Sequence, residues 1–138
     1  MHQDDVQFLA LGDALRQDER GFVYFPFQHP LAVSPSLEML TSCHIISILP
    51  SQMRGQHQHP YKTEWLYVFH GQGLFFWRDR DDYLQKRLLD GNHTLVVIPP
   101  GIPHTLRNEG PDSLYLLSWR VTRGPDQDEP DTVPALLV

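Results

Sequence analysis

The sequence predicts an all-β, single-domain protein in which short antiparallel strands form a sandwich or barrel. From Gly21 onward, runs rich in Val, Ile, Leu and aromatic residues alternate with clusters of Pro, Gly, Asn and Asp, a pattern typical of this fold class. Twelve prolines and nine glycines among 138 residues favour short strands over long helices. This length corresponds to one domain with one apolar core.

The expected elements are strands joined by turns. Residues 6–15 contain the only plausible helix, although they are also compatible with a strand. Residues 70–73 and 108–112 are predicted to form hairpin turns, and the charged stretch 78–82 a solvated loop. Strands are expected within GFVYFPF (21–27), EMLTSCHIISIL (38–49), EWLYVFHGQGLFFWRD (64–79), HTLVVIP (93–99) and LYLLSWRV (114–121).

The barrel core is expected at about residues 40–122, with N-terminal strands in 5–39 and a C-terminal tail in 123–138. The tail ends in the apolar stretch VPALLV, which we expect to dock on the barrel or on a second subunit. Trp65, Tyr67 and Phe69 share one face of their strand. They either pack under the N-terminal strands or form a dimer interface, and we expect a homodimer.

Composition argues against several classes of function. A net charge of −6 does not suit a nucleic-acid groove, which needs a basic surface. The sequence contains no run of about 18 apolar residues, so no membrane span is predicted. The N-terminus lacks the basic start and unbroken apolar stretch of a signal peptide. Cys43 is the only cysteine, so no internal disulfide can form and a cytoplasmic location is expected.

Three histidines and a glutamate form a candidate metal site. His57 and His59 are two residues apart, so on an extended strand they project from the same face. Glu64 has the opposite parity, but a turn at 60–62 can reset it, and His104 follows the Pro- and Gly-rich PPGIP. Such ligands suit zinc, iron, manganese or nickel. The alternative is four unrelated polar residues, since the chain contains eight histidines.

The spacing of these residues resembles the two signature motifs of the cupin superfamily. The pattern H-x-H-x4-E-x6-G begins at His57, and G-x7-P-x-G-x2-H-x3-N runs from Gly91 to Asn108. This resemblance implies a double-stranded β-helix, which is a jelly-roll barrel, with one divalent metal ion at its mouth. The implied metal ligands are His57, His59, Glu64 and His104.

The segment RGQHQHPYKTE, residues 54–64, carries a finer resemblance. It looks like the RG-x-H-x-H-x-x-K-x-E segment of the cupin epimerase domain that ends bifunctional capsular-polysaccharide nucleotide-sugar reductase/epimerases. Residues 98–119 and the PDT at 130–132 are similar to that domain too. DERG at 18–21 resembles a D-x-R-G turn of nucleotide-keto-sugar isomerases and epimerases. Because no reductase domain precedes this barrel, a partner activity is expected from another chain.

This finer resemblance implies a sugar epimerase or isomerase that acts on a nucleotide-linked keto sugar in polysaccharide biosynthesis. Epimerisation beside a ketone requires a base to remove a weakly acidic proton and a positive group to hold the enolate. Lys62, two residues before Glu64, is the candidate base, and Arg54 or the metal is the candidate oxyanion holder. A solvated turn lysine is the alternative role of Lys62.

Two other functions stay open. Residues 73–104 look like the strand–charged-loop–strand run of acireductone dioxygenases, which implies a metal-dependent oxygenase. Those enzymes are longer, place the glutamate one residue closer to the second histidine, and lack a counterpart of Asn108. The third possibility is a barrel that binds a small ligand or metal without turnover.

His44 is a weaker candidate for the pocket. It adjoins Cys43 on one predicted strand, so only one of the two side chains can face the interior. We expect a surface or core position for His44. It would border the pocket only if it pointed inward.

Overall fold

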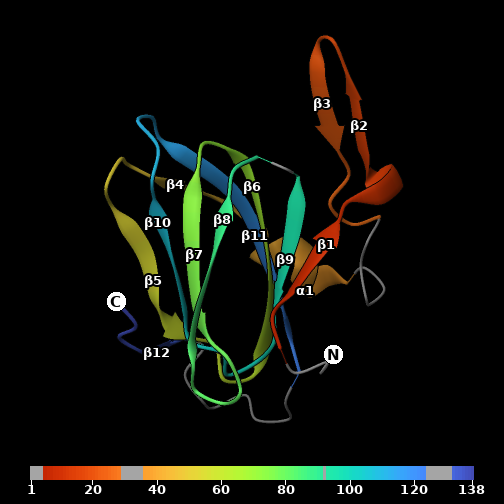
Figure 1. The fold of residues 1–138 in the computed structure, drawn as a ribbon. Coiled ribbons are helices and arrows are strands. Elements are labelled where there is room, and N and C mark those ends of the chain that lie inside the picture. The colour runs from red at the N-terminus through yellow and green to blue at the C-terminus, as the bar shows by residue number, and fades with distance from the viewer. Residues whose placement is uncertain (1–4, 29–35, 92, 124–131) are drawn as a thin grey trace.

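The protein folds into an all-β jelly-roll barrel (Figure 1), in a computed structural model that describes residues 5–28, 36–91, 93–123 and 132–138. Two five-stranded antiparallel sheets form the barrel, and a β2–β3 hairpin projects beyond its upper end. The first sheet has the order β1 (Gln7–Ala10), β9 (Thr94–Ile98), β6 (Lys62–His70), β11 (Leu114–Thr122) and β4 (His44–Ile48). The predicted fold class is confirmed.

The second sheet contains the other five strands of the barrel. Its order is β12 (Val133–Pro134), β5 (Met53–Gln58), β10 (His104–Asn108), β7 (Gly73–Arg78) and β8 (Leu84–Leu89). The projecting hairpin consists of β2 (Leu15–Asp18) and β3 (Gly21–Tyr24). No helix within the described ranges is long and apolar enough to cross a membrane.

The α-helix lies in another part of the chain than predicted. Residues 6–15 form β1 and a 3₁₀ turn, η1 (Gly12–Ala14), whereas the expected strand 38–49 begins with α1 (Leu37–Ser42). Ser36 caps α1, because its Oγ accepts a hydrogen bond from the Met39 amide at 3.3 Å. Met39 is fully buried, so the cap and tertiary packing together favour a helix where local composition suggested a strand.

The turns at 70–73 and 108–112 connect the two sheets, so the prediction that they close hairpins is wrong. β6 pairs with β9 and β11, whereas β7 pairs with β8 and β10. Gly71 has a φ of +90°, which reverses the chain direction between sheets at little steric cost. The charged stretch 78–82 does join a hairpin, β7–β8, and residues 80–82 are exposed as expected.

The apolar core lies on both faces of the first sheet. Between the sheets, Phe75, Val96 and Leu106 belong to one buried cluster. On the outer face, Trp65, Tyr67 and Trp119 form a second cluster, which the N-terminal segment and α1 cover. Core packing therefore accounts for Trp65 and Tyr67, and the homodimer stays a prediction without support from this face.

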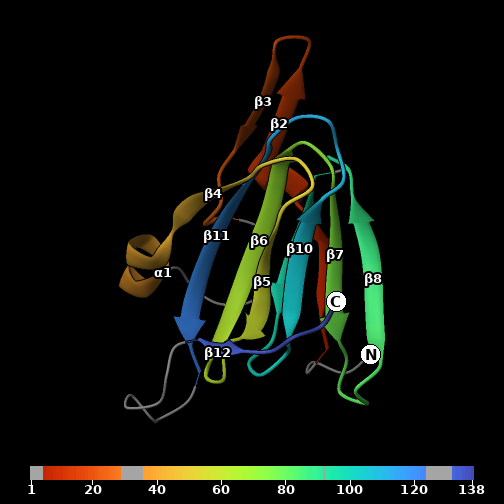
Figure 2. The ribbon, with the colours of Figure 1, turned by 90° about the vertical axis from the view of Figure 1, so that its left-hand side faces the viewer.

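The C-terminal tail docks on its own barrel. β12 pairs with β5 (Figure 2), and Leu137 is buried. The Gln56 side chain accepts a hydrogen bond from the Leu137 amide at 2.6 Å and donates one to the Val138 carbonyl at 2.6 Å. The linker predicted at the start of the tail falls mostly on residues 124–131, which lie outside the described residues.

Asn108 holds the connection between β10 and β11, and its removal is expected to destabilise the fold. Its Nδ2 donates to the carbonyls of Ile48 and Asp112, both at 2.8 Å, and its Oδ1 accepts from the Gly110 amide at 2.8 Å. Asn108→Ala leaves these groups without partners, so we expect about 3 kcal/mol lower unfolding free energy in urea titrations. Gln85→Ala, which removes an exposed amide, should change stability by less than about 0.5 kcal/mol. Equal losses would contradict this role.

Candidate metal centre and pocket

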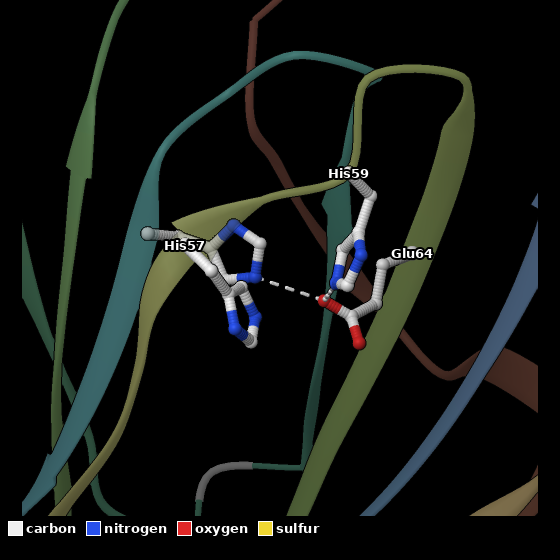
Figure 3. A group of neighbouring side chains, drawn as sticks. His57, His59 and Glu64 are labelled. Atoms are coloured by element: carbon white, nitrogen blue, oxygen red, sulfur yellow. Dashed lines mark ion pairs between the residues drawn. The ribbon is translucent and has the colours of Figure 1, made fainter. Parts of the chain in front are cut away.

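Four side chains meet at one end of the barrel, and they are the four predicted metal ligands. His57 lies on β5, His59 just after it, Glu64 near the start of β6, and His104 at the start of β10. One possible ligand atom from each residue lies within 4.8 Å of those of the other three. Figure 3 shows His57, His59 and Glu64 converging on the same space. His59, Glu64 and His104 are buried, and His57 is half-buried.

Strand pairing brings these residues together. β10 and β5 are antiparallel, and His104 is directly opposite His57. Gly55 is paired with Thr105 of β10, next to an irregularity in the register, and has a φ of +117°. A Cβ at this position would lie 2.7 Å from the Thr105 Cα and 2.8 Å from the His104 carbonyl oxygen. Glycine is therefore required at position 55 for the two strands to align their histidines.

The contacts between Glu64 and the histidines fit a bound cation. Glu64 Oε1 lies 2.9 Å from His104 Nε2 and 3.4 Å from His59 Nε2. Nδ1 of His104 is 2.9 Å from the Ile102 carbonyl, which can only accept, so a neutral His104 ring would turn its Nε2 lone pair toward the carboxylate. Two acceptors in contact repel unless a proton or a metal ion balances them. Two ligand atoms that each lie about 2.1 Å from the same ion are about 3.0–3.4 Å apart when the ligand–metal–ligand angle is between 90° and tetrahedral.

Neighbouring groups orient these ligands. The Ser118 hydroxyl donates to Glu64 Oε2 at 2.9 Å, which leaves Oε1 facing the histidines. The Thr132 hydroxyl lies 3.3 Å from Nδ1 of His59, and the Ile102 carbonyl fixes the ring of His104. Such outer hydrogen bonds set the tautomer and direction of metal-binding side chains. Thr132 is the last residue of the PDT segment, residues 130–132, whose sequence resembles the cupin epimerase domain.

The protonation of the cluster also suits a metal. Burial, with smaller contributions from the nearby His104 and His59, lowers the pKa of His57 to about 4. Burial alone would raise the pKa of Glu64, but hydrogen bonds donated by His104 and His59 and the positive charge of these rings when protonated outweigh this effect and hold the pKa well below its usual range. At neutral pH, His57 is therefore neutral and Glu64 is ionised, which are the forms that bind a cation.

A pocket of about 160 Å³ opens beside the cluster. The four candidate ligands form part of its wall, and Arg54, Arg120, His44 and Thr132 add polar groups. The rest of the lining consists of Gly55 and five aliphatic residues, which are Ile46, Ile48, Leu66, Leu106 and Leu116. The pocket thus combines a charged, metal-competent wall with an apolar one.

Only one of the two predicted catalytic residues, Arg54 and Lys62, lines the pocket. Arg54 lines the pocket, where its Nε donates to the Ser47 carbonyl at 2.9 Å. Lys62 shares the face of β6 with Glu64, but it does not line the pocket, and its Nζ lies 3.7 Å from Glu38 Oε2. The proximity of Lys62 to Glu64 in sequence therefore does not place the ammonium group in the pocket.

Sequence reasoning missed several residues of the pocket and of the cluster's surroundings. Arg120 and Ser118 are on β11, with Arg120 directly opposite Glu64. His44 is on β4 and lines the pocket, which corrects the expectation of a surface or core position. Alternation along LYLLSWRV could have placed Ser118 and Arg120 on one face. It could not have shown that this face meets Glu64.

DERG lies far from this pocket. Residues 18–21 form the tip of the β2–β3 hairpin, which projects from the upper end of the barrel, whereas β5 ends at the lower end (Figures 1 and 2). The Arg20 amide and guanidinium donate to the Asp18 carboxylate at 2.8 and 2.6 Å. These contacts stabilise the turn itself, so within this chain DERG makes no contribution to the site.

The sequence model of the polysaccharide biosynthesis C-terminal domain family matches residues 36–133, which contain all four cluster residues and all the residues that line the pocket. The chain belongs to this family. Its cupin resemblance is likewise confirmed at the level of the fold. No curated protein sequence matches this chain significantly.

Several solved structures are similar to this chain in fold. The capsular polysaccharide assembling protein CapF from Staphylococcus aureus is 25% identical with a TM-score of 0.59, and the match covers 69% of this chain and 26% of CapF. The chain thus spans about a quarter of the length of CapF. The 3,4-ketoisomerase QdtA from Thermoanaerobacterium thermosaccharolyticum is 13% identical with a TM-score of 0.71, over 96% of this chain and 88% of QdtA. A dTDP sugar isomerase from Desulfovibrio desulfuricans is 17% identical with a TM-score of 0.70, over 94% and 83%.

Proposed function

We propose that this barrel is an isomerase that moves a proton at the carbon beside the carbonyl of a keto sugar, nucleotide-linked, in polysaccharide biosynthesis. The observation that carries the proposal is the pocket in which a metal-competent cluster and Arg54 line the same small space. Membership of the polysaccharide biosynthesis C-terminal domain family and the 25% identity with CapF support it.

The size of the pocket supports a small reacting group. At about 160 Å³ it is smaller than the roughly 300–1,000 Å³ sites that hold drug-sized ligands. One sugar ring is therefore the part of a nucleotide sugar expected inside, with the nucleotide outside the pocket. QdtA, whose fold this chain shares, has been crystallised with TDP-4-keto-6-deoxyglucose.

The chain's own charges suit an enolate. His57, His59, Glu64 and His104 would hold one divalent ion, either zinc, iron, manganese or nickel. When bound, such an ion supplies Lewis acidity to a ligand oxygen. Arg54 and Arg120 both line the pocket, so positive charge is available to a carbonyl oxygen as it becomes negative. The apolar wall strengthens these interactions because it keeps water away.

Solvent exchange tests the proposal directly. A reaction that removes the C–H proton beside a carbonyl must exchange it with solvent, so incubation with 4-keto nucleotide sugars in deuterium oxide should place deuterium there. NMR and mass spectrometry measure the incorporation, and an oxygen electrode should record no oxygen uptake. A control incubation with the corresponding sugars reduced to 4-hydroxyl compounds should show no exchange.

Two outcomes would contradict the proposal in different ways. If the keto sugars do not exchange and an enediol consumes oxygen on the iron-loaded protein, the dioxygenase function is correct. If neither reaction occurs but a ligand binds tightly, the barrel is a binding module.

A further inference from the structure

His44 is the histidine of the pocket lining that does not belong to the metal cluster. It begins β4, the edge strand of the first sheet, and Ile46 and Ile48 follow on the same face. All three side chains line the pocket, whereas Ile45 between them is 68% exposed. The alternation of β4 therefore turns His44 toward the space that the cluster also faces.

A backbone carbonyl fixes the imidazole of His44. Its Nδ1 lies 2.7 Å from the Ser42 carbonyl oxygen, where β4 follows α1. Because a carbonyl only accepts hydrogen bonds, Nδ1 must carry the hydrogen. In the neutral ring Nε2 then holds the lone pair. His44 is thus held in the tautomer that can accept a proton at Nε2.

No other residue in the pocket lining combines these properties. Arg54 and Arg120 carry guanidinium groups that remain protonated in proteins, and the Thr132 hydroxyl is a weak base. His57, His59, Glu64 and His104 are engaged as ligands if a metal is bound. Lys62 lies outside the lining and beside Glu38. Among the described lining residues, His44 is the proton acceptor that stays available.

The position of His44 leaves room for a substrate ring. β11 separates β4 from β6, and Ser118 lies opposite His44 on one side and Leu66 on the other. Two strand spacings place His44 and Leu66 about 10 Å apart at their Cα atoms. Glu64 lies two residues before Leu66 on β6, and its side chain is on the same inward face. His44 and the cluster therefore line the same pocket from positions about two strands apart, and a sugar ring in the pocket can contact both.

We propose that His44 is the catalytic base of the keto-sugar reaction, an inference that rests on the proposed function. Nε2 takes the proton from the carbon beside the carbonyl, and the C–H electron pair forms the C=C bond of an enolate. The carbonyl π electrons move onto the oxygen, which faces the positive charges of the pocket. Return of a solvent-derived proton to the same carbon restores the ketone, so no oxidant or reductant is needed.

His44→Gln tests this assignment with a side chain of similar size that cannot act as a base. Deuterium incorporation into a 4-keto nucleotide sugar should fall by about 10²-fold or more. Zinc content and the dissociation constant of the same nucleotide sugar, measured calorimetrically, should stay within about threefold of wild type. His70→Gln, at the exposed end of β6, is the matched control and should exchange at the wild-type rate.

Each outcome is informative. Loss of exchange with metal and ligand binding retained supports His44 as the base. Exchange that persists in His44→Gln overturns it, and loss in Lys62→Met alone would assign the base to Lys62. Loss of exchange together with zinc or ligand binding would show a structural role and also overturn the proposal. Failure of the wild-type protein to exchange any keto sugar would instead refute the proposed function, and the base assignment with it.

Discussion

His57→Ala is expected to abolish high-affinity metal binding. The four candidate ligands converge within 4.8 Å, and removal of one leaves a three-residue site in which Glu64 is still buried. Loss of only an outer hydrogen-bonding partner lowers metal affinity by about 10–100-fold. Loss of a ligand should therefore lower zinc affinity by more than about 100-fold, as measured by competition with a chromophoric chelator.

The matched control for this variant is His70→Ala. His70 is exposed, its ring lies 5.8 Å from that of Tyr115, and neither residue lines the pocket. Its removal should leave zinc affinity unchanged. Equal zinc binding by wild type and His57→Ala would show that the cluster does not hold the metal, and the metal-dependent part of the proposed function would be withdrawn.

Gly55→Ala should destabilise the fold and disturb the metal centre together. The new Cβ would lie 2.7 Å from the Thr105 Cα, which belongs to the backbone and cannot rotate away. In addition, the φ of +117° is unfavourable for any residue with a Cβ. We expect a loss of about 3 kcal/mol or more in unfolding free energy from strain and clash combined. Because β5 must move from β10, His57 should also separate from His104 and zinc affinity should fall.

Gly91→Ala separates these two causes. Gly91 has a φ of +88°, but a Cβ there would meet nothing within 4 Å. This variant therefore carries the backbone strain without the clash, and it should lose only about 1–2 kcal/mol and bind zinc normally. Urea unfolding and chelator competition on both variants provide the comparison. If Gly55→Ala costs no more than Gly91→Ala, the close approach of β5 and β10 does not constrain this position.

The sequence by itself determined the fold class and the identity of the metal-competent cluster. Short apolar runs between Pro and Gly turns are a local property, and so is the projection of side chains at i and i+2 from one face of a strand. The spacing of His57, His59, Glu64 and His104 added a resemblance that placed them in one site, and the structure brings these four together. The metal itself remains a prediction for the chelator experiment.

Only the tertiary structure decided which strands are neighbours and which side chains share the pocket. The turn at Gly71 could be located from local composition, but not the fact that β6 and β7 belong to different sheets. In the same way, Lys62 is close to Glu64 in sequence but contacts Glu38, which is contributed by a helix that local composition did not predict. His44 reaches the pocket because β4 pairs with β11 and β11 with β6. Such pairings join residues far apart in the chain, and the two-residue period of a strand does not say which of its faces will be covered.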